Sequence, residues 1–330
     1  MLILAKAAMA ILLGFILAIV TGLVLIPIFR KFHIGQYVSH YIGERHLKKE
    51  GTPTMGGLIF IIPTLIALFL LYINGSIEIT HSLIILIFVF VSYAILGFVD
   101  DYLKIKFHNN KGLTIVSKLL VQMLIALIFF YIFMSNGGKS DLVITSLGIN
   151  IPLGWTFGLF ILFLLVGTSN AVNITDGLDG LAGGLSAIAF FAFGIIAWNT
   201  GWLVGYQEIA IFSFVLAGSL LGFLVFNAHP AKVFMGDLGS LSLGAALATI
   251  AILTRHELSL ALIGGIFVIE TLSSLIQIIA IRKFNKKVFK RAPLHHHFEV
   301  VGLNEQDIVR YFWVAGLILA MAAITYGVWL

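Results

Sequence analysis

A short polar segment between two long apolar runs holds the residues best suited to chemistry. Residues 173–179 read Asn-Ile-Thr-Asp-Gly-Leu-Asp, which places one amide and two carboxylates, Asp176 and Asp179, close together. Oxygen ligands of this kind suit Mg²⁺ or a polar substrate, and acids beside apolar runs are costly to keep without a role. Asp100-Asp101 and Asp237 end other apolar runs in the same way. These three acidic sites are therefore the candidate functional centre.

Each acid also has a structural interpretation. An acid at the start of a helix can cap it and interact favourably with the helix dipole, and this alternative stays open for Asp179 and Asp237 taken singly. Asp100 and Asp101 instead follow an apolar run, where the end of a helix disfavours negative charge. That pair needs a partner, which favours a functional role.

The composition predicts an all-α polytopic integral membrane protein. Hydrophobic residues make up 60% of the chain and charged residues 11%, whereas a soluble domain has roughly 25% charged residues. A crossing helix needs about 20 apolar residues. Ten runs of suitable character lie near residues 3–26, 55–73, 82–99, 114–134, 154–172, 180–198, 207–226, 239–254, 259–281 and 311–330. The run at 239–254 is short, so a tilted or partly re-entrant segment is expected there.

The distribution of charge predicts an orientation. If the ten spans alternate, only Lys6, Lys139 and Arg255 of the 20 lysines and arginines lie on the face that holds both termini. The basic face is then cytoplasmic, both termini are extracytoplasmic, and the acidic sites lie on the cytoplasmic face. We expect a single transmembrane domain over residues 1–330. In the loop at 135–153, alternating polar and apolar residues predict a short hairpin.

Two further polar features have alternative interpretations. Three consecutive histidines, His295, His296 and His297, point in different directions on a helix and cannot all chelate one ion there. Hydrogen bonding to phosphate or substrate is expected, and solvated surface histidines are the alternative. Glu270, within an apolar run together with Gln277, is either a proton-relay acid or part of a helix–helix hydrogen bond. The absence of cysteine, of a P-loop and of a Gly-x-Ser-x-Gly elbow argues against the corresponding chemistries.

Five motifs carry a family resemblance. They are Gly-Thr-Pro-Thr-Met-Gly-Gly (51–57), Gly-Phe-Val-Asp-Asp (97–101), the segment 170–184, Phe-Met-Gly-Asp (234–237) and Pro-Leu-His-His-His-Phe-Glu (293–299). With them the chain resembles, over its whole length, the phospho-N-acetylmuramoyl-pentapeptide transferase family of the polyprenyl-phosphate N-acetylhexosamine-1-phosphate transferase superfamily.

The resemblance implies a reaction and its partners. Phospho-MurNAc-pentapeptide would pass from UDP-MurNAc-pentapeptide to undecaprenyl phosphate, giving lipid I and UMP in peptidoglycan biosynthesis. It also implies ten spans, Mg²⁺ dependence and a place in the bacterial inner membrane, with the lipid bilayer as a partner. No nucleic acid is expected as a partner, and a homodimer is left open.

The resemblance further implies residue roles. Asp237 would be a metal ligand, and Asp100 and Asp101 would be catalytic. The residues expected to line the nucleoside and phosphate site are Lys49, Thr54, Asn173, Asp176, Gly177, Leu178, Asp179, Asn227, Phe234, Gln277 and His296. We place Asp237 and His296 with the catalytic group as well, and assign His295 and His297 to substrate binding. Either Asp100 keeps the lipid phosphate deprotonated for direct attack, or an aspartate attacks and forms a phospho-enzyme.

Two other functions are alternatives to this interpretation. A sister transferase would act on UDP-GlcNAc and make a different lipid-linked sugar. A transporter of lipid-linked precursors would carry its functional charges near the bilayer midplane, on broken helices. The acids of this chain instead cluster at the ends of the expected spans, which favours the transferase.

Overall fold

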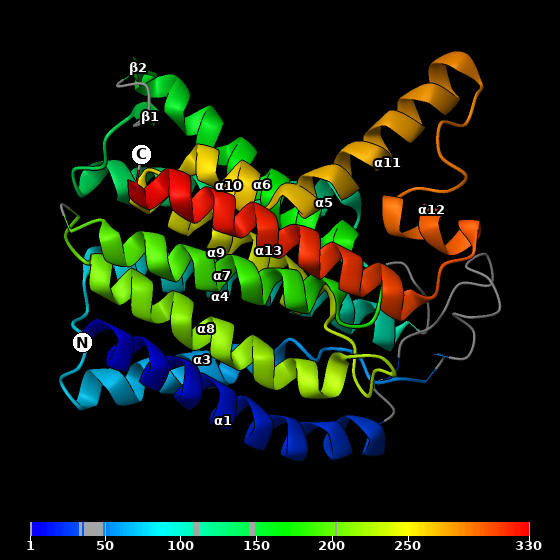
Figure 1. Ribbon diagram of the computed structural model, residues 1–330, viewed down its shortest axis with the longest axis horizontal. Coiled ribbons are helices and arrows are strands. Elements are labelled where there is room, and N and C mark those ends of the chain that lie inside the picture. Colours follow the sequence, from blue (N-terminus) through cyan, green and yellow to red (C-terminus); the bar gives the residue numbers. More distant parts are fainter. Residues whose placement is uncertain are drawn as a thin grey trace.

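In the computed structural model, long helices run side by side along the long axis of the molecule (Figure 1). The structure describes residues 2–32, 35, 49, 51–107, 112–144, 149–201 and 203–329. The helices are α1 (Leu2–Lys31), α3 (Leu58–Ile73), α4 (His81–Lys106), α5 (Ile115–Ser135), α6 (Phe157–Thr175), α7 (Leu181–Asn199), α8 (Tyr206–Asn227), α9 (Gly236–Thr254), α10 (Glu257–Ile263), α11 (Gly265–Phe284), α12 (Leu294–Val301) and α13 (Glu305–Trp329). A short 3₁₀-helix, η3 (Gly154–Thr156), precedes α6.

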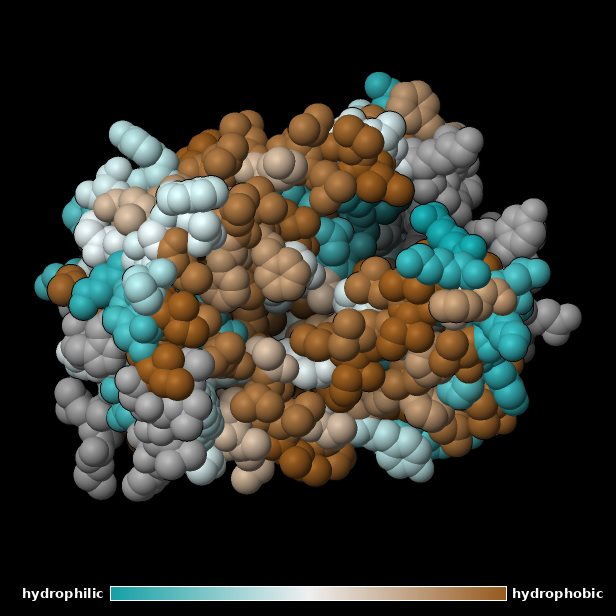
Figure 2. Space-filling model, turned by 90° about the horizontal axis from the view of Figure 1, so that it is seen from above, coloured by the Kyte–Doolittle hydropathy of each residue, from teal (hydrophilic) through white to brown (hydrophobic). Residues whose placement is uncertain are grey.

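The helices have the length and composition of membrane spans. Within the described ranges, nine of them are long and apolar enough to cross a bilayer, and α3 is a shorter apolar helix of 16 residues. The surface agrees, since hydrophobic residues form a band across the middle and hydrophilic residues gather mainly at the two ends (Figure 2). The prediction of a polytopic helical membrane protein is confirmed.

One predicted span is divided. The run at 259–281 forms two helices, α10 and α11, which meet at Gly264. Glycine is a poor helix former and commonly ends a helix, so apolar character continues across this point while the helix does not. Beyond the break, α11 diverges from the bundle towards its C-terminal end (Figure 1). The short run at 239–254, by contrast, lies in the uninterrupted helix α9, so a re-entrant segment is not found there.

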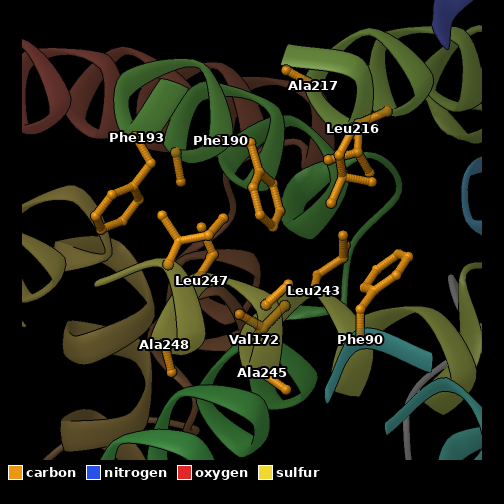
Figure 3. Close-up of a cluster of buried hydrophobic side chains, with 14 of the residues drawn as sticks. Phe90, Val172, Phe190, Phe193, Leu216, Ala217, Leu243, Ala245, Leu247 and Ala248 are labelled. Carbon is orange, nitrogen blue, oxygen red and sulfur yellow. The ribbon is translucent and has the colours of Figure 1, made fainter. Parts of the chain in front are cut away.

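The core lies between α7, α8 and α9. These three helices are buried along most of their length, whereas α1, α5 and α13 expose most of theirs. Phe190 and Phe193 of α7 point towards Leu243 and Leu247 of α9 (Figure 3). Lipid tails are as apolar as these side chains, so close packing rather than hydrophobic exclusion holds such helices together.

Small residues let α1 approach α8. A Cβ atom added to Gly218 of α8 would lie 2.0 Å from the carbonyl oxygen of Ile11, and one added to Gly14 of α1 would lie 2.2 Å from that of Val215. Neither backbone leaves room for a side chain at these positions. Gly14 and Gly218 therefore form the kind of small-residue contact that membrane helices use.

The predicted hairpin is confirmed. Strands β1 (Asp141–Ile144) and β2 (Ile149–Pro152) pair antiparallel, with Leu142 opposite Ile151. Arg255, which ends α9, holds the hairpin through its Nη2 atom, 2.6 Å from Oδ2 of Asp141. This ion pair holds the pKa of Asp141 below its usual range, although burial works in the opposite direction. The hairpin lies at the end of the bundle where α1 begins and α13 ends (Figure 1).

The opposite end of the bundle gathers the polar motifs. There α4, α6 and α8 end, α5, α7, α9 and α13 begin, and α12 lies beside them (Figure 1). Hydrophilic residues also line a hollow in the apolar surface towards this end (Figure 2). Gly97 of α4 makes the approach possible, because a Cβ atom there would lie 2.3 Å from the carbonyl oxygen of Asp237. The end of α4 thus packs directly against the start of α9.

Candidate active site

Three carboxylates meet where α4 packs against α9. Asp100 and Asp101 lie near the end of α4 and are 1% and 4% exposed, and Asp237 lies in the first turn of α9. One oxygen from each carboxylate lies within 4.8 Å of the other two. Oxygen donors at this spacing are the ligands that Mg²⁺ prefers. The donor set therefore fits the divalent cation that the sequence indicated.

Two lysines bridge these carboxylates. Lys104 Nζ lies 2.6 Å from Asp100 Oδ2 and 3.2 Å from Asp237 Oδ2. Lys118 Nζ, from α5, donates to Asp237 Oδ2 at 2.7 Å and lies 3.3 Å from Asp100 Oδ1. Buried acids need such cationic partners. The sequence analysis missed both lysines, although Lys104 stands four residues after Asp100, the spacing of neighbours on one helix face.

Asn173 joins the same cluster from α6. Its Nδ2 atom donates to Asp237 Oδ1 at 2.9 Å and to Ser240 Oγ at 2.8 Å. Each oxygen of Asp237 thus accepts from a distant residue, either Asn173 or Lys118, rather than from the first-turn N–H groups of α9. The capping interpretation of Asp237 is therefore not what the structure shows.

The two acids of α4 also accept hydrogen bonds from backbone N–H groups of neighbouring elements. Asp101 Oδ2 accepts the N–H of Leu238 at 3.1 Å, which ties the start of α9 to α4. Asp100 Oδ1 accepts the N–H of Leu113 at 2.8 Å, just before α5. The pair thus fixes the two elements that carry Asp237 and Lys118.

A second charged cluster surrounds Lys49. Its Nζ atom donates to Asp179 Oδ1 at 2.7 Å and to Glu305 Oε1 at 2.6 Å. Burial by itself lowers the pKa of Lys49, but the charges of Asp179 and Glu305 outweigh it and raise that pKa above its usual range. Asp179 Oδ2 accepts the N–H of Ala231 and lies 3.0 Å from His229 Nδ1. The carboxylate of Asp179 therefore binds these partners and does not cap α7. His229 and Glu305 were missed by the sequence analysis.

The turn between α6 and α7 lies between the two clusters. Burial, reinforced by the charges of Asp237 and Asp101, raises the pKa of Asp176 to about 8. Its carboxyl group therefore holds a proton at neutral pH and can donate a hydrogen bond. Leu178 is 3% exposed. Gly177 packs against α12, because a Cβ atom there would lie 2.3 Å from Nε2 of His295.

The three histidines bind three different partners on α12. His295 Nδ1 lies 3.0 Å from Glu270 Oε2, His296 Nδ1 lies 2.6 Å from Glu299 Oε2, and His297 Nδ1 accepts the N–H of Lys290 at 3.1 Å. Burial lowers the pKa of His296, although Glu299 opposes the shift. Within the described residues, the groups that could hold a metal ion are Asp179, His229 and Glu305, and Asp100, Asp101 and Asp237.

Glu270 and Gln277 of α11 both form hydrogen bonds to α12 or to the loop before it. Glu270, fully buried, accepts the backbone N–H of His295 at 3.1 Å in addition to the ring contact, which favours a helix–helix hydrogen bond over a proton relay. Gln277 Oε1 accepts the N–H groups of Val288 and Phe289, and its Nε2 donates to the carbonyl of Phe289. The amide of Gln277 thus orders the loop before α12.

Two motifs far apart in sequence pair through their backbones. Phe234 N donates to the carbonyl of Pro53 at 2.7 Å, and the carbonyl of Phe234 accepts the N–H of Gly56 at 2.8 Å. Thr54, between those partners, is 7% exposed. Asn227 accepts the N–H of Gly180 and donates to the carbonyl of Val233. These bonds join the segments around residues 54, 180, 227 and 234.

Comparison with known proteins gives consistent relatives. Residues 82–255 match the profile of glycosyl transferase family 4, and residues 49–61 match phospho-N-acetylmuramoyl-pentapeptide-transferase signature 1. The phospho-N-acetylmuramoyl-pentapeptide-transferase of Bacillus subtilis is 47% identical over 320 residues, which is 97% of each chain. That of a Geobacillus species is 45% identical over 322 residues, 98% of each chain. The matched segments include both carboxylates of α4, Asp237 and Lys49.

Proposed function

Because this chain belongs to glycosyl transferase family 4 and, within it, to the phospho-N-acetylmuramoyl-pentapeptide-transferases, we propose that it transfers phospho-MurNAc-pentapeptide from UDP-MurNAc-pentapeptide to undecaprenyl phosphate. The products are lipid I and UMP, in peptidoglycan biosynthesis. The chain is a multi-pass protein of the bacterial inner membrane. The observation that carries the chemistry is the partly buried cluster of three carboxylates and two lysines at one end of the bundle.

Charge neutralisation is the main requirement of this reaction. Exchange between two phosphates depends on in-line positioning and electrostatic stabilisation more than on covalent machinery. Mg²⁺ held by Asp237, beside Asp100 and Asp101, would supply positive charge at the pyrophosphate. Lys104 and Lys118 lie against the same carboxylates and offer ammonium donors for phosphate oxygens.

The attacking group is the phosphate of the lipid. Asp100 is the residue we assign to keep that phosphate deprotonated. It is a buried carboxylate of the three-acid cluster, and the Lys104 and Lys118 ammonium groups beside it would bind the same phosphate. The phosphate oxygen then forms the new P–O bond, and the bond to UMP breaks. His296, which is held by Glu299, is assigned to the phosphates as a hydrogen-bonding group.

The nucleoside is assigned to the place where the segments around residues 54, 180, 227 and 234 are joined. The residues are those expected from the sequence: Lys49, Thr54, Asn173, Asp176, Gly177, Leu178, Asp179, Asn227, Phe234, Gln277, His295 and His297. Their support is spatial, because the backbone pairing of Phe234 with Pro53 and the bond of Asn227 to Gly180 bring these segments together. For Gln277 and His295 the support is indirect, since their side chains bind protein groups in this structure.

The proposed topology has ten spans, with α3 as the short tenth one. Both termini are then extracytoplasmic and the site faces the cytoplasm. The support is geometric, since α1 begins and α13 ends at the end of the bundle opposite α12 (Figure 1). The positive-inside rule orients the basic end towards the cytoplasm.

Single cysteine reporters test this topology cleanly, because the chain has no cysteine. We expect Lys287→Cys, in the α11–α12 loop, to react with a membrane-impermeant maleimide only in inverted vesicles. Asn136→Cys, after α5, should react only in intact cells or spheroplasts. Labelling of both positions from the same side would contradict the ten-span arrangement.

The function itself is tested with the purified protein in detergent. We expect UMP release and a lipid-linked product from UDP-MurNAc-pentapeptide and undecaprenyl phosphate with Mg²⁺. UDP-GlcNAc in place of the muramoyl substrate should give neither. Turnover of UDP-GlcNAc alone would identify the sister transferase. Failure to release UMP from either sugar nucleotide would favour a transporter.

A further inference from the structure

One acid outside the motifs binds three distant segments. Glu305 opens α13, and its Oε1 atom accepts both from Lys49 Nζ at 2.6 Å and from the backbone N–H of Asp179 at 2.7 Å. Its Oε2 atom lies 3.5 Å from Nδ1 of His229. The side chain of Glu305 is 14% exposed, and that of Asp179 is 3% exposed. Both bonds of Oε1 are therefore largely shielded from water, where charge-assisted hydrogen bonds are strong.

Helix capping and metal binding do not explain this acid. A carboxylate in the first turn of α13 is favoured by the helix dipole. Within the described residues, however, the Glu305 carboxylate accepts from Lys49 and from the N–H of Asp179, and no N–H group of α13 donates to it. Asp179, His229 and Glu305 also form a donor set of metal type. This set has only two carboxylates beside an imidazole, whereas Mg²⁺ prefers oxygen ligands, and the Lys49 ammonium lies against both carboxylates.

We propose that Glu305 is a positioning residue for nucleotide binding, because its carboxylate holds the Lys49 ammonium and the Asp179 N–H in one fixed arrangement. This inference rests on the function proposed above, in which Lys49 and Asp179 contact the UDP substrate. Lys49 lies 256 residues before Glu305 in sequence, and its long side chain has many rotamers. Two carboxylates restrict that side chain in advance, so less conformational freedom is lost when substrate binds.

The loss of Glu305 should therefore appear in substrate binding. We expect Glu305→Leu, which removes the acceptor at similar volume, to raise KM for UDP-MurNAc-pentapeptide about tenfold to a hundredfold. The value of kcat should stay within about threefold of wild type, because the residue does not touch the reacting atoms. Glu305→Gln keeps an Oε1 acceptor and loses only the charge, so its KM should rise less than that of Glu305→Leu.

A double-mutant cycle separates positioning from general structural support. We measure KM for Lys49→Met, Glu305→Leu and the double variant. If Glu305 acts through Lys49, the fold-increase in KM of the double variant will be well below the product of the two single fold-increases. The matched control is Asp307→Asn in the same turn of α13, where the side chain is 38% exposed and its ion-pair partner Arg310 lies 3.5 Å away. The control should keep wild-type KM and kcat.

Each outcome decides the inference. The inference is overturned if the KM increase of the double variant equals the product of the two single increases. It is also overturned if kcat of Glu305→Leu falls by as large a factor as its KM rises. Size exclusion and thermal unfolding show whether Glu305→Leu is folded. If it is not, the KM of Glu305→Gln is measured instead, and a wild-type KM in that variant contradicts the positioning role of Glu305. Wild-type protein is measured in the same assay. Failure of wild type to release UMP would refute the proposed function, whereas normal wild-type turnover with a silent Glu305→Leu would refute only the role of Glu305.

Discussion

Replacement of Asp237 by asparagine should reduce turnover to background while the protein still inserts and purifies normally. Asp237 provides a carboxylate to the three-acid cluster, and its oxygens bind Lys118 and Asn173. An amide lacks the negative charge that a hard dication requires. Activity should therefore not recover fully at high Mg²⁺.

Two measurements check the metal assignment. UMP release is followed across a Mg²⁺ titration, and thermal unfolding is followed across the same titration without substrate. Wild type should gain stability with Mg²⁺ by mass action, and Asp237→Asn should gain much less. Asp307→Asn is the control for a lost carboxylate elsewhere. Near wild-type activity in Asp237→Asn would remove this residue from the metal site.

The second large effect is expected at Asp100. If Asp100 keeps the lipid phosphate deprotonated, Asp100→Asn should lower kcat by about 10²–10⁴-fold, the usual worth of a general base. The KM for the UDP substrate should change little, because the nucleoside is assigned elsewhere. The loss should shrink as pH rises through the second phosphate ionisation, near pH 6, since solvent then deprotonates the lipid.

The covalent alternative predicts different results. If Asp100 were the nucleophile, no pH would restore activity in Asp100→Asn. Wild-type protein given UDP-MurNAc-pentapeptide without lipid would release a stoichiometric burst of UMP and retain labelled phosphate. Such a burst would overturn direct attack. A pH-independent loss without a burst would assign Asp100 a structural role, consistent with its bond to the N–H of Leu113.

Local sequence patterns predicted the elements well. Ten apolar runs and a hairpin in the loop at 135–153 were expected from hydropathy and alternation, which report on neighbouring residues only. Within the described residues, nine long apolar helices, the shorter α3 and the hairpin are found there. The break at Gly264 was missed because the apolar character of α10 continues into α11 and hides the end of the first helix. Motif resemblance predicted the family, and the relatives confirm it.

The assignment of acids to one end also followed from the sequence. Alternating spans place every second helix end on the same face, and Asp100, Asp179 and Asp237 all stand at such ends. The alternation of the spans does not predict which helix ends contact one another. The contact between α4 and α9 depends on Gly97, where the absence of a side chain lets the backbone of Asp237 approach.

The partners of the acids were decided only by the tertiary structure. The sequence indicated that Asp100 and Asp101 needed a partner, and the i,i+4 spacing of Lys104 was a usable local signal. Lys118 reaches Asp237 across 119 positions, and Glu305 reaches Lys49 across 256. Periodicity carries no information over such separations. Which helix ends meet is set by the packing of small and large side chains along whole helices, and that packing exists only once the chain has folded.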